Sequence, residues 1–244
     1  MMRSALLLLT LFLALSSSAQ VNNIPADSSL TDTPLGNSVK VFIKGIGDNA
    51  EIYNGREYFF APKAYKGDPY FGDTILFRPA VIKYNGTWYK DISTLYDSYQ
   101  GVLAVLRPTN QAIFTLKDSL VSEFYLHDRH FYHITKPDSA GVLKKGFYED
   151  NYHGKSNVLT QHYKVRTEEA VQPRVLVTFK GEKNYYIIKD RQAHRVNSKS
   201  SVLNVFKDKK AELNSYIKKN RIEFDDNRIN AIVKLTSYYD QISQ

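Results

Sequence analysis

The sequence predicts a mainly β protein of the α+β class, in which an antiparallel meander, a sandwich or a curved open sheet is followed by a C-terminal α-helical hairpin. Between residue 39 and about residue 197, short segments rich in Val, Ile, Tyr, Phe and Thr are interrupted at short intervals by Gly, Asn, Asp and Pro, which is typical of antiparallel strands. From Ser200 onward, apolar residues recur with the period of an α-helix. We therefore expect a β domain over residues 39–198 and a helical segment over residues 199–244.

The amino-terminal segment has the layout of a secretory signal peptide. Arg3 is followed by an apolar run of 11 residues, 5–15, and by small residues that end at Ala19. A helix that crosses a bilayer needs roughly 20 apolar residues, so we expect residues 1–19 to be a cleaved signal and not an anchor. Residues 20–38 are polar and aperiodic, which predicts a flexible lead-in. The expected location is the periplasm, the cell surface or the medium, with no transmembrane segment.

Composition excludes several kinds of chemistry. The chain has no cysteine, which rules out disulfides, thiolate nucleophiles and thiolate metal sites. Its formal net charge of +8 favours anionic surfaces, so an anionic envelope component or a glycan is the expected partner. No nucleic-acid-binding motif accompanies the charge, and we expect no specific nucleic-acid partner.

Two Asn-Gly pairs predict β-hairpins, because both residue types tolerate the positive φ angles of a type I′ turn. These pairs lie in EIYNGREYFF (51–60) and in VIKYNGTWYK (81–90). In the second hairpin, a two-residue turn at Asn85-Gly86 sets the register of the cross-strand pairs. The expected pairs are Tyr84 with Thr87, Lys83 with Trp88, and Ile82 with Tyr89.

One face of the second hairpin is expected to be core and the other exposed. Ile82, Tyr84 and Tyr89 share the core face, whereas Lys83 and Trp88 lie opposite one another on the other face and should form a cation–π pair. The chain contains 18 tyrosines, and an aromatic sheet face can stack on a sugar or hold an apolar ligand. Trp88, Lys83 and Tyr89 are therefore the candidate ligand-binding residues.

Half of the six histidines lie at a three-residue spacing in HDRHFYH (127–133). On one continuous strand, His127 and His133 would be about 20 Å apart and His130 would face the opposite side. If the chain instead turns at Asp128-Arg129, His127 stands opposite His130, and these two are the metal candidates. Since a catalytic zinc needs three protein ligands, we expect no metal site and no cofactor.

No local catalytic motif occurs in the chain, which lacks a G-x-S-x-G elbow, H-E-x-x-H and the phosphate-binding G-x-x-x-x-G-K-[ST]. We assign no catalytic residue and expect an exported, non-enzymatic binding or envelope-associated module. Two alternatives stay open. One is a carrier of an apolar or glycan ligand on an aromatic sheet face, and the other is a hydrolase with scattered acids or a histidine site.

Two amphipathic helices are expected after residue 199, forming a basic hairpin that packs on the sheet. The first starts at Ser200 or Ser201 as its cap and ends at Asn220. The second is capped by Asp225 or Asp226. The apolar stripes are Val202, Phe206, Leu213 and Ile217 in the first helix, and Ile229, Ile232, Val233, Thr236 and Tyr239 in the second.

Three stretches carry a family resemblance: the signal end LSSSAQ, the segment GFYEDNYHGKSNVL (146–159), and the tail KSSVLNVFKDKKAELNSYIKKNRIEF followed by YYDQIS. Together they resemble a group of small exported proteins from Bacteroidota-type bacteria. The resemblance runs over most of the mature chain and implies export and a β-rich body with a lysine-rich helical tail. It supplies no mechanism and no functional residue.

Overall fold

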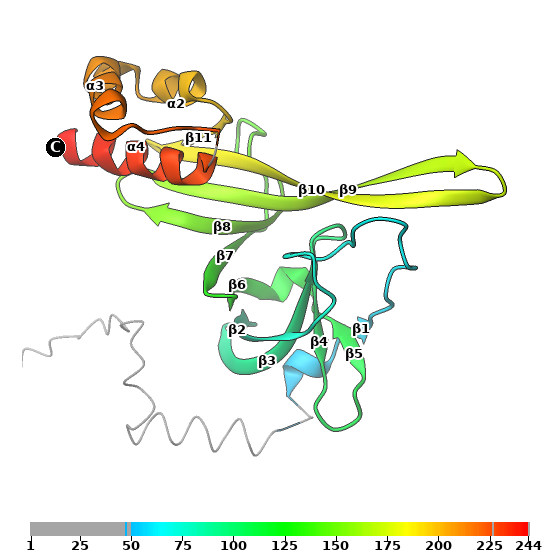
Figure 1. Cartoon of the computed structure of the whole chain (residues 1–244). Coiled ribbons are helices and arrows are strands. Elements are labelled where there is room, and N and C mark those ends of the chain that lie inside the picture. Colours follow the sequence, from blue (N-terminus) through cyan, green and yellow to red (C-terminus); the bar gives the residue numbers. More distant parts are fainter. Residues whose placement is uncertain (1–46, 48–49, 226, 244) are drawn as a thin grey trace, which may run out of the picture. The chain divides into compact units, whose positions relative to one another are not determined.

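Eleven antiparallel strands form one open sheet in the part of the chain that the structure describes, which is residues 47, 50–225 and 227–243 of a computed structural model (Figure 1). The strand order is β1-β5-β4-β3-β2-β6-β7-β8-β9-β10-β11. The strands are β1 (Arg56–Glu57), β2 (Arg78–Tyr84), β3 (Thr87–Asp97), β4 (Val102–Leu106), β5 (Ile113–Thr115), β6 (Val121–Leu126), β7 (Arg129–Ile134), β8 (Gly146–His153), β9 (Asn157–Val171), β10 (Arg174–Lys189) and β11 (Gln192–Val196). The expected fold class is confirmed.

The chain divides into two units, Met1–Phe42 and Ile43–Gln244, and every described residue belongs to the second. The expected signal peptide (1–19) and lead-in (20–38) lie outside the described residues. Among the helices that the structure describes, none combines the length and the apolar character needed to cross a bilayer.

The hairpin at Asn85-Gly86 is confirmed pair by pair. Tyr84 pairs with Thr87, Lys83 with Trp88, and Ile82 with Tyr89. Asn85 and Gly86 have φ angles of 48° and 78°, as a type I′ turn requires. Along β2 the buried residues alternate, because the core face takes every second side chain.

The hairpin expected at Asn54-Gly55 is wrong. Glu51–Tyr53 form a single 3₁₀ turn (η3), and β1 then pairs with β5 from a distant part of the chain. A Cβ atom on Gly55 would lie 2.1 Å from the carbonyl oxygen of Thr115. Glycine is therefore needed here for close approach of two backbones and not for a turn.

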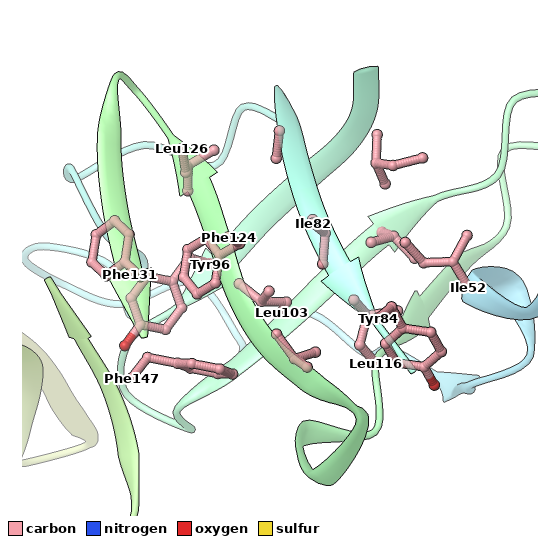
Figure 2. Packing of buried hydrophobic residues seen from close by; sticks show 14 of the residues in the cluster. Ile52, Ile82, Tyr84, Tyr96, Leu103, Leu116, Phe124, Leu126, Phe131 and Phe147 are labelled. Carbon is pink, nitrogen blue, oxygen red and sulfur yellow. The ribbon is translucent and has the colours of Figure 1, made fainter. Parts of the chain in front are cut away.

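The main core lies on one face of β2–β8 (Figure 2). The rings of Phe124 and Phe131 stack across β6 and β7 at 4.7 Å between centroids, and Phe147 of β8 meets Phe124 edge to face. Ile82 and Tyr84 are buried in this cluster as expected, and Tyr89 packs against it. Tight packing of rings from successive strands stabilises the register of the meander.

The first expected helix is divided in two at Phe206. The structure has α2 (Lys199–Val205), a 3₁₀ turn η5 (Lys207–Lys209) and α3 (Lys210–Asn220), followed by α4 (Arg228–Ile242). Phe206 is fully buried and stacks on Tyr239 at 4.0 Å between centroids, and its backbone leaves the helical conformation there. Burial of the Phe206 ring thus interrupts a helix that the apolar periodicity predicts to be continuous.

The helix caps also differ from those expected. Ser198 caps α2 in a reciprocal arrangement with Ser201, two or three residues before the expected cap. Asn227, and neither Asp225 nor Asp226, caps α4 by accepting a hydrogen bond from the backbone N–H of Asn230. The helices pack on β9–β11 through a second cluster, whose fully buried members include Val158, Ile187, Leu213 and Ile232.

Candidate functional site

Two of the three candidate ligand-binding residues share a surface. The Lys83 ammonium lies 5.3 Å from the centroid of the Trp88 ring, as expected for a cation–π pair. Tyr89 is on the opposite face, where it packs against the core. The three side chains therefore do not form one site, and contact of Lys83 and Trp88 with a ligand stays a prediction.

The face of Lys83 and Trp88 continues across β6 and β7 as a row of rings that we call the outer row: Trp88, Tyr125, His130 and Tyr132. Its charged groups are paired with one another. Glu123 accepts from the Lys83 ammonium at 3.1 Å and contacts His130 Nε2 at 2.9 Å. Burial, together with Asp150 and Glu123 nearby, raises the pKa of Tyr132 to about 12. The outer row thus satisfies most of its own polar groups.

The histidine hairpin exists, but its turn lies one residue earlier than expected. His127 and Asp128 occupy the two turn positions with φ angles of 52° and 58°, so Leu126 pairs with Arg129 and Tyr125 pairs with His130. His130 stacks on the Tyr125 ring at 4.2 Å between centroids and does not face His127. Within the described residues, no three His, Cys, Asp or Glu side chains are grouped as metal ligands. The pairing of His127 with His130 is therefore wrong.

His127 instead borders a half-open cavity of about 420 Å³ on the core side of the sheet, which we call the β9 pocket. Its walls come from the segment between β1 and β2, the turns after β3 and β6, and strands β7, β9 and β10. The lining residues are Phe71, Gly72, Asp73, Ser98, His127, Arg129, His162, Tyr163, Lys164, Gly181, Glu182 and Lys183.

The Phe71 ring forms the apolar wall of the β9 pocket. The His127 ring stacks on it at 6.2 Å between centroids, and the His162 ring meets it edge to face at 4.9 Å. The Arg129 guanidinium lies over the same ring at 5.7 Å from the centroid. The Phe71 N–H donates to the Tyr96 carbonyl at 2.9 Å, and this hydrogen bond fixes the Phe71 backbone to β3. Three nitrogen-bearing side chains are thereby held around one rigid ring.

Glu149 of β8 is a buried carboxylate that orients two of these groups. Its Oε2 atom lies 2.5 Å from His162 Nε2, and both of its oxygens accept hydrogen bonds from Arg129 Nη1 at 3.2 Å. Burial by itself would raise the pKa of Glu149, but His162 and Arg129 hold that pKa below its ordinary value of 4.5. Glu149 therefore carries its charge at neutral pH and is neutralised by its two neighbours.

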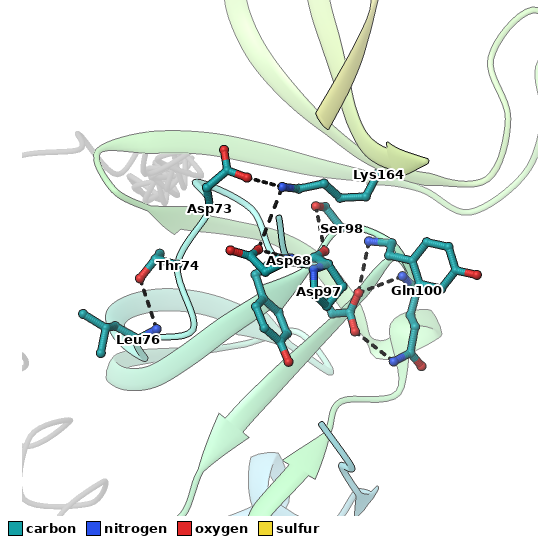
Figure 3. A network of polar contacts seen from close by, with 11 residues as sticks. Asp68, Asp73, Thr74, Leu76, Asp97, Ser98, Gln100 and Lys164 are labelled. Atoms are coloured by element: carbon teal, nitrogen blue, oxygen red, sulfur yellow. Dashed lines mark hydrogen bonds and ion pairs between the residues drawn. The ribbon is translucent and has the colours of Figure 1, made fainter. Parts of the chain in front are cut away.

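Lys164 of β9 is a buried cation whose partners lie on the segment before β2 (Figure 3). Its side chain is only 5% exposed, whereas Asp73, its ion-pair partner, is 76% exposed. Asp68 lies farther away, at 3.9 Å. A buried ammonium is costly unless it is paired, so the charge of Lys164 depends on a carboxylate that water also reaches.

Asp73 is held by backbone of unusual conformation. It has a φ angle of 53°, and Gly72 before it has a φ of 76°. Left-handed backbone costs a non-glycine residue about 1 kcal/mol or more. This local cost is offset by the ion pair with Lys164. The contact therefore joins a buried cation to a carboxylate that is open to solvent.

The main residues of the β9 pocket were not found from the sequence. Arg129, Glu149, His162 and Lys164 come from three different strands and are in no local motif. One signal was present. In β9, His162 and Lys164 follow Val158 and Thr160 at alternate positions, and all four are buried. Ionisable residues at core-facing positions of a strand indicate a polar site inside the fold.

A comparison of the chain with protein-family models, with curated proteins and with solved structures finds no match. The site is therefore interpreted from its own geometry.

Proposed function

We propose that this protein is an exported, non-enzymatic binding module, and that the β9 pocket binds the anionic group of a small ligand or of an acidic envelope glycan. A carboxylate, phosphate or sulfate suits the pocket, because each accepts charge-assisted hydrogen bonds from ammonium and guanidinium groups. The observation that carries the proposal is the burial of Lys164 beside a cavity, with an exposed loop carboxylate as its partner.

The balance of charge around the cavity supports an anion more than a cation. Glu149 is already neutralised by Arg129 and His162. If a ligand displaces Asp73, the Lys164 ammonium is available to it, and the half-exposed Arg129 guanidinium has further N–H groups beside the Nη1 that Glu149 engages. Lys183 adds a further positive charge to the lining, and the one further acid there, Glu182, is paired with Lys180 at 2.6 Å. Since the surroundings are partly desolvated, such contacts count for more than at an open surface.

The outer row supports a ligand site less well than the β9 pocket does. Its acid and base groups pair with each other at 2.9–3.1 Å, and the faces of Tyr125 and His130 are stacked together. A ligand there would have to break contacts that already satisfy both partners. In the β9 pocket it would replace one contact with an exposed side chain.

The proposal is tested by calorimetric titration of the purified protein with glucuronate, inorganic phosphate, sulfate and an acidic oligosaccharide. We expect at least one of these to bind the wild-type protein, and Lys164→Met to weaken that binding at least tenfold through loss of a charged hydrogen bond. Lys90→Met is the matched control, because Lys90 is an exposed residue of β3 that does not line the pocket. Its affinity should stay within about twofold of wild type.

The arms of this titration also identify the source of the anion. Binding of the oligosaccharide alone assigns an envelope glycan, and binding of the free anions assigns a small solute. The proposal fails if no compound binds, or if Lys164→Met binds as well as wild type. Turnover of an ester or glycoside of these acids would contradict the non-enzymatic assignment.

A further inference from the structure

The outer part of the β9–β10 hairpin extends beyond the strands on either side of it, as Figure 1 shows. We call residues 165–180 the arm. On one side, β8 pairs with β9 only as far as Thr160, and on the other side, β11 pairs with β10 only from Tyr185. All residues of β9 from Val165 to the turn are exposed, and so are the apolar side chains of Val171 and Val175 at the tip.

One edge of the arm is occupied by the chain itself. The N–H of Tyr65 donates to the Val177 carbonyl at 2.8 Å, and the N–H of Phe179 donates to the Lys66 carbonyl at 2.9 Å. In the arm, the odd-numbered residues of β10 therefore direct their N–H and C=O groups away from β9 and toward residues 65–66. Because Thr178 pairs with Thr167, the residues of β9 that direct their backbone groups outward are the even-numbered ones.

The outward-directed residues of β9 in the arm are therefore Arg166, Glu168 and Ala170. No strand in the described part of the chain pairs with this edge. Exposed edges of this kind are templates for pairing with another chain. Earlier on the same edge, the Lys164 N–H is directed at the Ser98 carbonyl at 3.4 Å, which limits the free edge to the arm.

We propose that the arm pairs with the arm of a second copy of this chain, β9 against β9 in antiparallel orientation, with Thr167 at the two-fold axis. In this register Arg166 of each copy lies opposite Glu168 of the other copy, which makes two such pairs. Both are outward-directed residues, so each pair exchanges two backbone hydrogen bonds, about four in total. The inference concerns a different surface from the β9 pocket and does not depend on the proposed function.

Several registers place outward-directed residues of the two copies opposite one another. Among these, the charges of the opposed side chains favour the register centred on Thr167. A shift that moves the axis to Glu168 places Glu168 opposite itself, and a shift to Arg166 places Arg166 opposite itself. Directly opposed like charges are unfavourable, whereas opposite charges stabilise a cross-strand pair. In the isolated chain, Arg166 already forms an ion pair with Glu168 of its own strand. In the dimer the same two residues would pair across the axis.

The arm also avoids the repulsion expected from the basic chain as a whole. The arm contains three basic and two acidic residues, so its net charge is only +1, although the chain carries +8. The paired surface is small, which predicts a weak and concentration-dependent dimer and not an obligate one.

The absence of cysteine makes a direct test possible, because a single introduced cysteine is the only thiol in the chain. At a non-hydrogen-bonded antiparallel pair the two Cα atoms lie about 4.5 Å apart, which is within the range for a disulfide. We expect Thr167→Cys to form a covalent dimer on mild oxidation of the purified protein. Val175→Cys is the control, because it is 59% exposed and lies on the other strand, at least ~14 Å from its counterpart.

A charge exchange tests the register independently of thiol chemistry. Arg166→Glu should weaken the dimer about tenfold in sedimentation equilibrium, because two pairs become repulsive at once. The double variant Arg166→Glu with Glu168→Arg should restore it. The proposal is overturned if Thr167→Cys crosslinks no faster than Val175→Cys, if wild type stays monomeric at millimolar concentration, or if the double variant is as weak as the single one.

Discussion

The inner and outer halves of the β9–β10 hairpin differ in burial although they belong to the same pair of strands. The register is continuous from Ile188 opposite Asn157 to Arg174 opposite Val171. In the inner half, Val158 and Ile187 are 0% exposed, whereas Val175 in the outer half is 59% exposed. Both halves contain β-branched residues at alternate positions.

The difference shows that covering elements, and not the strands themselves, decide the role of each half. Helices α2–α4 cover the inner half through the second cluster, and the Phe71–Asp73 region closes the β9 pocket beside His162 and Lys164. In the outer half, Tyr65 and Lys66 meet the edge of β10 and the Tyr99 ring packs on Phe179, whereas β9 from Val165 onward is exposed. The inner half therefore borders the β9 pocket, and in the outer half the edge of β9 has no strand partner among the described residues.

The largest expected effect comes from matched truncations in the two halves. Ile187→Ala should lower the free energy of unfolding by about 2–5 kcal/mol, because it leaves a cavity in the second cluster. Val175→Ala should change it by less than about 0.5 kcal/mol, since that side chain is exposed. Urea denaturation of both variants measures the two values. A loss of more than about 1 kcal/mol at Val175 would show that the arm is packed in solution.

A second, smaller effect is expected from the carboxylate that organises the inner half. Glu149→Gln should cost about 1–3 kcal/mol at pH 7, because it removes the charge that Arg129 and His162 neutralise. The pKa of Glu149 is lower in the folded chain than its ordinary value of 4.5, so its contribution is complete above that pH. It is lost as the pH falls through the folded-state pKa.

The pH dependence of the stability difference between wild type and Glu149→Gln shows whether Glu149 is charged in the folded protein. The stability gap between wild type and Glu149→Gln should be present at pH 7 and should narrow as the pH falls below 4.5 and through the lower folded-state pKa, where wild-type Glu149 becomes protonated. Thermal unfolding at a series of pH values measures the gap. A gap that widens on acidification would mean that Glu149 is neutral in the folded protein at pH 7.

The smallest effect is expected at the exposed partner of Lys164. Asp73→Asn removes the internal competitor for the buried ammonium, so we expect the affinity for whichever anion binds wild type to rise about three- to tenfold. The free energy of unfolding should fall by about 1 kcal/mol, because the amide oxygen can still accept from the buried Lys164 ammonium but no longer neutralises it. The titrations described for Lys164→Met provide the measurement. Weaker binding in this variant would indicate that Asp73 contacts the ligand directly.

Local turn chemistry explains which parts of the fold were predictable. The Asn85-Gly86 hairpin was predicted with its register because the two residues and their flanking strands contain the whole interaction. The same dipeptide at Asn54-Gly55 failed, because β1 pairs with β5, which lies far away in the sequence. Around His127-Asp128 the sequence left a continuous strand, a bulge and a hairpin at Asp128-Arg129 open, and the structure has a hairpin whose turn lies one residue earlier.

The candidate site was predictable only in part, for a related reason. Lys83 and Trp88 are opposed across one turn, and their contact follows from the local register. Phe71, Glu149 and Lys164 meet through the pairing of strands and the path of a long connecting segment, and none of them is near another in the sequence. No periodic pattern in the sequence indicates that these three residues lie close together.

By itself the sequence determined the β-rich class, the central hairpin and the helical tail, because each depends on turn residues and periodicity within a few residues of chain. Only the tertiary structure decided that His127 belongs with Phe71 and not with His130, and that Phe206 interrupts a helix. It also decided which half of β9 is covered. The physical reason is that burial and ion pairing depend on which distant surfaces meet, whereas turns and helix periods are set by neighbours in the chain.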